Sequence, residues 1–411
     1  MGNAAGSCVH SGQEHGEYKF CLLEGELSVI LPKPAESAGI HRCSLPEGGK
    51  AGAETGRIFV YNGMDFSGKR LAISLGLSYT IPYRRAGPLP GASTDRRERV
   101  MAELKHCPVL LEECIRGLNI RPEGVYVDGT LGRAGHSREI ARRLTTGRLI
   151  CIDRDQAALD AARERLAPWM DRVTLVHSNF SRIPEVLDEL GLPGADGVLL
   201  DLGVSSPQLD DASRGFSYQQ DAPLDMRMDQ TQPLTAAVVV NEWPEEELRW
   251  AFSRYGEERY ARQIAAAIVR RREQRPIETT LELVEVIRSA MPAAALREKQ
   301  HPAKRVFQAV RIAVNDELAA CAQAVDAVIP RLNPGGRLCI ITFHSLEDRL
   351  VKNGFQSWAR GCTCPPEFPV CVCGKTPVVK LTPRKPILPS RQEVEENPRA
   401  RSAKLRIAEK L

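Results

Sequence analysis

The chain has 411 residues and a mass of 45.4 kDa, a length that suits two or three domains. It carries 56 basic and 52 acidic residues, a net charge of +4, and 43% of its residues are hydrophobic, which excludes a wholly disordered chain. No stretch reaches the roughly 20 apolar residues of a membrane helix. Glu24 and Glu26 interrupt the apolar residues near the N-terminus, so we predict no signal peptide. We therefore expect a cytoplasmic protein with no membrane partner, whose 12 cysteines are thiols or metal ligands.

Residues 1–100 differ in composition from the rest of the chain, because they hold 15 of its 32 glycines. Apolar residues follow no sustained period there, except at 57–61 and 70–73, where we predict strands. Glycine loses much backbone entropy on folding, so we predict a mostly disordered extension. One alternative is a small accessory domain, and another is that the natural protein starts near Met101.

From residue 101 onward, apolar strand-like runs alternate with helical patterns. The predicted order is a helix at 109–118, a strand at 124–128, a helix at 137–144 with Ser137 as its N-cap, a strand at 148–153, a helix at 156–166, a strand at 173–177, a helix at 183–190 and a strand at 195–201. Such alternation predicts a parallel sheet with helices on both faces. Ligands of such sheets bind at the carboxyl ends of the strands.

The region from 216 to 315 is predicted to be helical throughout, with helices at 244–255, 258–272, 281–290 and 304–313. Alternation resumes with a helix at 317–332, a turn at 333–336 and a strand at 337–342. We therefore predict one α/β domain in two parts, 101–215 and 316–411, interrupted by a helical insertion at 216–315. The second part is expected to end in a basic tail.

Three predicted strands end in an acid, Asp128, Asp153 and Asp201, and the first is followed by glycines spaced G-x-x-G-x-x-G. This spacing is not the dinucleotide-binding fingerprint G-x-G-x-x-G. A cofactor without a phosphate, such as S-adenosylmethionine, is therefore the better candidate. Its binding needs close approach of the backbone to its amino-acid end, which residues 132–136 offer. It also needs a carboxylate for the ribose hydroxyls and an apolar face for the adenine. We assign the last two roles to Asp153 and Phe180, whereas the alternative is that the acids are helix caps and solvated strand ends.

Six long motifs resemble the bacterial MraW/RsmH family from about His106 to the C-terminus. They are Asp128-Gly-Thr-Leu-Gly-Arg-Ala-Gly-His136, Asp201-Leu-Gly-Val-Ser-Ser-Pro-Gln-Leu-Asp210, Arg214-Gly-Phe-Ser217, Pro223-Leu-Asp-Met-Arg-Met-Asp229, His301-Pro-Ala-Lys-Arg-Val-Phe-Gln-Ala-Val-Arg311 and Phe343-His-Ser-Leu-Glu-Asp348. The resemblance implies the class I S-adenosylmethionine-dependent methyltransferase fold, which is Rossmann-like, with an all-helical insertion domain for RNA recognition. It also implies methyl transfer from S-adenosylmethionine to the exocyclic N4 amine of a cytidine in 16S ribosomal RNA, in the decoding region of the small subunit.

The resemblance also implies the residues that contact the cofactor. Relatives often have glycine where this chain has Ala134, and a methyl group is tolerated there if φ is negative. Matched by motif position, the cofactor contacts are Ala134, Gly135, His136, Asp153, Phe180, Asp201 and Gln208.

Methyl transfer to the weakly nucleophilic amine of cytosine requires alignment and an acceptor for the proton that the amine loses. Asp201 and the loop after it leave the fourth strand where the acceptor base is expected, so we assign catalysis to Asp201, aided by Ser205 or Ser206. The alternative for the two serines is a turn with capping hydroxyls. The D/N-P-P-Y/F motif of many amino-methyltransferases is absent from the sequence.

We expect Asp225, Arg227, Arg305 and His344 to contact the substrate. The alternatives are an ion-paired loop for Asp225 and Arg227 and a structural role for His344. RNA binding is predicted from charge: residues 374–411 hold ten basic and four acidic residues, a local +6, and further cations crowd the insertion, although a solvated helix face is the alternative. The insertion cations are Arg259, Arg262, Arg270, Arg271, Arg272, Arg275, Arg297, Lys299, Lys304, Arg305 and Arg311.

Four cysteines, Cys362, Cys364, Cys371 and Cys373, lie within twelve residues as two C-x-C pairs. They predict a structural zinc site, although C-x-C is tighter than the usual spacing and a proline-stiffened loop is the alternative. For the whole protein, the rival functions are an amino-methyltransferase acting on DNA or a small molecule, and an RNA-binding ribosome-assembly factor without catalysis. The sequence leaves the oligomeric state open between monomer and homodimer.

Overall fold

The computed structural model describes residues 108–362, 364–365, 368–370 and 372–411, together with five short strands in the N-terminal part of the chain. The chain divides into two units, Met1–Ser93 and Thr94–Leu411. Within the first unit, β1 (Val9–Ser11), β2 (Tyr18–Leu23) and β3 (Glu26–Ile30) form an antiparallel sheet, and β4 (Phe59–Met64) pairs with β5 (Arg70–Ser74). The last two strands overlap those predicted at 57–61 and 70–73. The disorder that we predicted for the rest of this segment lies outside the described residues.

The second unit is built on a seven-stranded sheet in the order β11-β12-β10-β9-β6-β7-β8. Strands β6, β7, β8, β9 and β10 pair in parallel, as the alternation predicted, whereas β12 runs antiparallel to both β10 and β11. The strand bounds are β6 (Val125–Asp128), β7 (Arg148–Asp153), β8 (Val173–His177), β9 (Ala195–Asp201), β10 (Leu332–Thr342), β11 (Val379–Leu381) and β12 (Lys404–Lys410).

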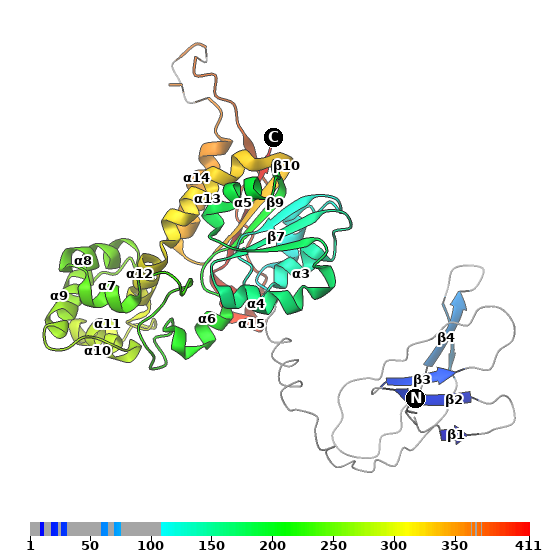
Figure 1. Ribbon diagram of the computed structural model, residues 1–411, viewed down its shortest axis with the longest axis horizontal. Coiled ribbons are helices and arrows are strands. Elements are labelled where there is room, and N and C mark those ends of the chain that lie inside the picture. The colour runs from blue at the N-terminus through cyan, green and yellow to red at the C-terminus, as the bar shows by residue number, and fades with distance from the viewer. Residues whose placement is uncertain are drawn as a thin grey trace. The chain divides into compact units, whose positions relative to one another are not determined.

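Helices cover both faces of this sheet (Figure 1). One apolar core joins α2, α3 and α4 to the sheet, and a second joins α5, α13 and α14 to the opposite face. The bounds of these helices are α2 (Leu111–Leu118), α3 (Gly135–Ala141), α4 (Gln156–Arg165), α5 (Ile183–Glu189), α13 (Glu317–Arg331) and α14 (Ser345–Ala359). The predicted α/β fold class with a mostly parallel sheet is confirmed. No helix in the described part of the chain is long and apolar enough to cross a bilayer.

The direction in which strands are added to the sheet reverses between β8 and β9. Strands β7 and β8 follow β6 on one side, whereas β9 and β10 lie on its other side. The strands adjacent to this reversal, β6 and β9, are neighbours. Their connections leave on opposite faces, which opens a crevice at their carboxyl ends. This topological switch point is where the fold favours ligand binding.

A separate helical core lies between β9 and β10 in the sequence. It is made by α7 (Ala236–Glu242), α8 (Glu245–Arg254), α9 (Ala261–Arg272), α10 (Thr280–Ala290) and α12 (Lys304–Asn315), whose buried side chains include Phe252, Ile264 and Val310. The short helix α11 (Ala293–Leu296) lies between α10 and α12 in the sequence. The expectation of helix throughout 216–315 is wrong for residues 216–235, which contain no helix. Asn315 fixes this irregular segment instead: its side chain bonds the carbonyl of Met226 and the N–H of Met228, each at 2.8 Å.

Three local predictions need correction. Ser137 is not the N-cap of its helix: α3 begins at Gly135, and the buried Ser137 hydroxyl donates to Asp128 Oδ2 at 2.6 Å. The predicted turn at 333–336 lies inside β10, as a break in its register with β9 between Leu332 and Arg337. The basic tail at 374–411 includes β12, which pairs along β10 with Leu405 and Ile407 buried. This strand is held in the sheet because its apolar residues alternate with charged ones.

Candidate active site

A cavity of about 400 Å³ lies at the switch point, beyond the carboxyl ends of β6, β7 and β9. Its volume is within the range of small-molecule sites. The seven residues predicted to contact the cofactor all line it, as do Ser205 and Ser206. Asp128 does not line the cavity; it is buried below it and accepts hydrogen bonds from Ser137 and from the backbone of Thr130. The first acid therefore supports the loop, whereas Asp153 and Asp201 face the cavity.

The loop between β6 and α3 has the left-handed backbone that allows close approach. Gly132 has φ +47°, and an added Cβ there meets only atoms at 3.9 Å. Ala134 has φ +57°, so the condition of a negative φ is not met, and the methyl group is held in a conformation that costs alanine about 1 kcal/mol. Its burial in the core offsets part of this strain.

Asp153 is held rigidly at the end of β7. Its Oδ2 accepts the N–H of Gly132 at 2.8 Å and its Oδ1 accepts the N–H of Asp155 at 2.9 Å. Burial raises the pKa of Asp153 to about 6, although these two hydrogen bonds act in the opposite direction. Each oxygen keeps a second lone pair for a ligand hydroxyl, and Phe180 lines the same cavity.

Asp201 is the acid with an unsatisfied atom. Its Oδ1 is buried and has no hydrogen-bond partner, whereas Oδ2 lies 3.9 Å from His136 Nδ1. Burial, with the neighbouring charges of Asp128 and Glu347, raises the pKa of Asp201 to about 8. Buried polar atoms are normally paired, so Oδ1 indicates a place where a ligand or substrate binds.

His136 lies beside Asp201 as a neutral ring. Its Nε2 is 3.1 Å from the carbonyl oxygen of Val109, so Nε2 carries the hydrogen and Nδ1 faces Asp201 as an acceptor. Burial lowers the pKa of His136 to about 4. At neutral pH, Asp201 is therefore the stronger base of the two.

Gln208 and two residues that sequence reasoning missed, Asp155 and Arg214, form a buried network beside the cavity. Asp155 Oδ2 accepts hydrogen bonds from Arg214 Nη1 and from Gln208 Nε2, both at 2.9 Å. Arg214 also donates to the carbonyls of Arg227 and Met228. Gln208 Oε1 accepts the N–H of Ser205, the N-cap of α6 (Ser206–Asp210), so the capping alternative applies to Ser205. The motif Arg214-Gly-Phe-Ser217, which resembles the family, could have identified Arg214 as a residue of the site.

The four residues expected to contact the substrate do not line the cavity. Asp225 and Arg227 form an ion pair at 2.8 Å, which is the ion-paired-loop alternative. Arg305 donates to the carbonyl of Glu257 at 3.3 Å. His344 is the N-cap of α14 and contacts Glu347, a buried acid that does line the cavity and that sequence reasoning missed.

Glu347 stays charged although it is buried. Its Oε2 accepts the N–H groups of Phe343 and His344. Burial would raise the pKa of Glu347, but its hydrogen bond with His344 and the charge of Arg311 hold that pKa below its usual value. Glu347 therefore contributes negative charge next to Asp201.

The positive charge is distributed differently from the sequence prediction. Arg311 is committed to a bidentate ion pair with Glu317, at 2.7 and 2.9 Å, and Arg272 donates to the carbonyls of Val240 and Trp243. In the C-terminal segment, Lys404 and Arg406 bind Asp348. Five arginines line the cavity: Arg133, Arg138, Arg154 and Arg165, which the charge prediction did not include, and Arg399 from the basic C-terminal segment.

Three of the four clustered cysteines lie together. The Sγ atoms of Cys362, Cys364 and Cys373 are all within 4.8 Å of one another. Cys371 lies outside the described residues. The cavity at the switch point has no cysteine in its lining.

Comparison with known proteins agrees with the sequence motifs. A "Ribosomal RNA small subunit methyltransferase H" from Brevibacillus brevis is 62% identical over 307 residues, which cover 74% of this chain and 98% of that protein. A protein with the same description from Symbiobacterium thermophilum is 59% identical over 307 residues, covering 74% and 96%. A solved rRNA methylase from Streptococcus thermophilus, with 12% identity and a TM-score of 0.32, covers 73% of this chain and 93% of its own, and this weak likeness adds no argument.

The family assignment rests on the sequence matches. The model of the MraW methylase family matches residues 103–411, which is where the six motifs lie and which excludes the segment at 1–100. The strand order, with β12 reversed between β10 and β11, is that of class I S-adenosylmethionine-dependent methyltransferases. The chain belongs to the MraW methylase family.

Proposed function

We propose that this chain transfers a methyl group from S-adenosylmethionine to the exocyclic N4 amine of a cytidine in the 16S RNA of the small ribosomal subunit. The family and the names of its relatives support this substrate class. The observation that carries the proposal is the cavity at the switch point, which places the unpartnered Oδ1 of Asp201 beside a preformed ligand site. Such an enzyme works in the cytoplasm, where ribosomal subunits are made.

The residues around the cavity fit the donor. The fixed carboxylate of Asp153 suits the two ribose hydroxyls, Phe180 suits the adenine ring, and the loop from Gly132 to His136 suits the amino-acid end. When bound, S-adenosylmethionine supplies an electrophilic methyl group on its sulfur. Gln208 would then act as support, because its amide is already bonded to Asp155 and Ser205.

Asp201 is the proton acceptor in this proposal. As the N4–methyl bond forms and the methyl–sulfur bond breaks, the amine becomes cationic and loses one proton. A carboxylate with a pKa near 8 and a buried, unpartnered oxygen can orient the amine and then take that proton. His136, with a pKa near 4, positions the carboxyl without competing for the proton. Ser205 and Ser206 line the entrance and help to align the base.

The arginines at the cavity are proposed to bind the RNA phosphates on either side of the target base. A cytosine must leave its stack before its amine can enter the cavity. Backbone phosphates would then lie at the cavity mouth, where Arg138 and Arg399 are exposed. Of the insertion cations predicted to bind RNA, seven are exposed and extend this contact: Arg259, Arg262, Arg270, Arg275, Arg297, Lys299 and Lys304.

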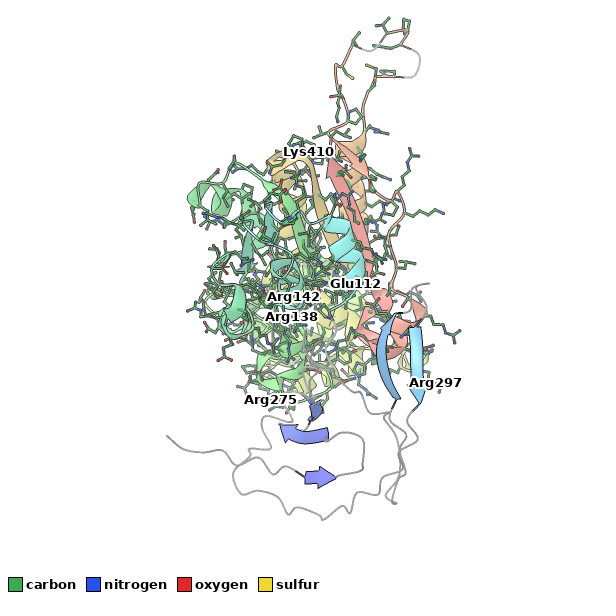
Figure 2. All side chains as sticks on the ribbon, turned by 90° about the vertical axis from the view of Figure 1, so that its right-hand side faces the viewer. Glu112, Arg138, Arg142, Arg275, Arg297 and Lys410 are labelled. Atoms are coloured by element: carbon green, nitrogen blue, oxygen red, sulfur yellow. The ribbon has the colours of Figure 1, made fainter. Side chains whose placement is uncertain are left out.

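Neutral replacement of a cavity arginine is expected to weaken RNA binding. Arg138→Gln and Arg399→Gln should each raise the Kd for small-subunit RNA roughly 3–10-fold and reduce the slope of log K against log salt by roughly 0.7–0.9. Fluorescence anisotropy at four salt concentrations measures both quantities. Arg142, one turn further along α3 and outside the cavity lining, provides the matched control Arg142→Gln (Figure 2). Equal losses in the control and in Arg138→Gln would contradict a phosphate site at the cavity.

The proposed function is tested with the purified full chain, labelled S-adenosylmethionine and small ribosomal subunits that lack the modification. Labelled N4-methylcytidine, identified by mass spectrometry of the digested 16S RNA, is the expected product. If DNA or a small amine is methylated and the ribosomal RNA is not, the result would favour the rival methyltransferase. RNA binding without methylation of any acceptor would favour the non-catalytic assembly factor.

A further inference from the structure

The three clustered thiols lie in a loop that projects from the sheet domain. The loop connects the end of α14 at Ala359 to the start of β11 at Val379 and contains no helix or strand in its described residues. Figures 1 and 2 show it extending away from the helices and strands in both views. None of the three cysteines lines the cavity, so they are not part of the candidate active site.

Apolar packing does not explain the shape of this loop. Phe368, Val370 and Val372 are 50%, 68% and 74% exposed, and they contribute little to a core. A segment without a core needs another source of stabilisation, such as a disulfide or a bound metal. The arrangement of the thiols distinguishes between these two.

The sulfur separations match metal ligands. Cys373 Sγ lies 3.7 Å from Cys362 Sγ. Two sulfurs on a tetrahedral zinc, each about 2.3 Å from the metal, are about 3.8 Å apart, whereas a disulfide bond is about 2.05 Å long. Cys364 Sγ is within 4.8 Å of both, so the three sulfurs are close enough together to bind one ion.

Two backbone N–H groups are directed at the sulfur atoms. The N–H of Cys364 points to Cys362 Sγ and the N–H of Val372 points to Cys364 Sγ, each at 3.4 Å. Such donors orient the sulfur atoms, as outer hydrogen bonds do at metal sites. Gly374, with φ +61°, allows the tight turn directly after Cys373.

We propose that Cys362, Cys364 and Cys373 bind a divalent zinc ion that closes the projecting loop. Thiolate sulfur in tetrahedral geometry selects zinc over the hard cations magnesium and calcium. The ion is structural, because none of its ligands lines the cavity where methyl transfer is proposed.

The test uses the full chain, expressed with zinc, purified with a reductant and freed of any affinity tag, and then dialysed against metal-free buffer. Elemental mass spectrometry is expected to find about one zinc per chain. The zinc should fall at least tenfold in Cys362→Ser and Cys373→Ser. The buried Cys321, in α13 and far along the chain from the loop, gives the control Cys321→Ala, which should keep its zinc.

A second measurement separates a specific site from loosely bound metal. Replacing zinc with cobalt(II) should produce the intense visible bands of tetrahedral thiolate coordination in the wild-type chain, and these bands should be absent from Cys373→Ser. Metal-free wild-type protein, equal zinc in the cysteine variants, or a Cys362–Cys373 disulfide found under reducing conditions would each overturn the proposal. Methylation by Cys373→Ser is expected to stay within threefold of wild type, since the site is structural.

Discussion

Replacing Asp201 by asparagine is expected to lower kcat for methyl transfer by roughly 10²–10⁴-fold, because the variant lacks the carboxylate that we propose as the acceptor of the amine proton. Single-turnover transfer of labelled methyl groups to small-subunit RNA measures this loss, and calorimetry checks donor binding separately. Asp211→Asn, at an exposed aspartate ten residues further along, should behave like wild type. A loss confined to donor affinity, with kcat unchanged, would assign Asp201 to cofactor binding alone.

The same carboxyl predicts the pH profile of the wild-type enzyme. Asp201 accepts a proton only when it is ionised, and its pKa is raised to about 8. We therefore expect kcat/KM to rise with pH up to about 8 and to level off above it, with the rising limb absent from Asp201→Asn. A flat profile between pH 6 and 9 would exclude a proton acceptor with this pKa.

Stability should change in the opposite direction to activity. A carboxyl whose pKa is higher in the folded than in the unfolded state makes the folded protein bind more protons, so the free energy of unfolding falls as pH rises from about 4 to about 8. Asp201→Asn removes this buried charge, and its Tm at pH 8.5 should exceed that of wild type by roughly 2–4 °C. At pH 5 the two Tm values should agree. A lower Tm at pH 8.5 would mean that the Asp201 carboxylate stabilises the fold.

Breaking the buried ion pair between Arg214 and Asp155 is expected to be the most destabilising change at the site. Arg214→Met leaves the Asp155 carboxylate buried without its cation, and it also leaves two carbonyls of the 227–228 loop without a donor. Loss of one partner of a buried pair costs about 3–5 kcal/mol. Thermal unfolding should show a Tm lowered by roughly 10 °C, and donor binding should weaken because Arg214 no longer holds Asp155, the hydrogen-bond partner of Gln208.

An exposed pair of the same length is the control. Arg391 and Glu395 are also 2.9 Å apart, but both are largely exposed, so Arg391→Met should change stability by less than about 1 kcal/mol. The double variant Arg214→Met with Asp155→Asn should recover part of the lost stability, because no charge is left buried. Equal effects in Arg214→Met and Arg391→Met would show that burial does not decide the contribution of the pair.

The parallel part of the fold was predictable because it follows from short-range patterns of apolar residues in the sequence. Strands β7, β8 and β9 have the predicted bounds, since each is an apolar run flanked by helical patterns. Strand β12 was missed because its charged residues resemble a tail, and only pairing with β10, more than sixty residues earlier, places Leu405 and Ile407 in the core. Ser137 was misassigned for a related reason: its hydroxyl satisfies the buried Asp128, a partner that no local pattern specifies.

For the site, all seven residues that the motifs predict as cofactor contacts line the cavity, but the distribution of basic residues along the sequence predicted the positions of the cations poorly. Arg311 and Lys404 counted as available charge until the structure paired them with Glu317 and Asp348. Conversely, Arg138 belongs to no basic run, and the fold alone brings it to the same cavity as Arg399 of the basic C-terminal segment.

The sequence by itself determined the family, the alternation of strands and helices, and the acids that end β7 and β9, because these follow from residue type and short-range spacing. Only the tertiary structure decided what those acids do. Burial and the nearby charges of Asp128 and Glu347 raise the pKa of Asp201, and the loop N–H groups fix Asp153. Desolvation and long-range charge depend on which distant segments pack together, and neither can be read from neighbouring residues along the chain.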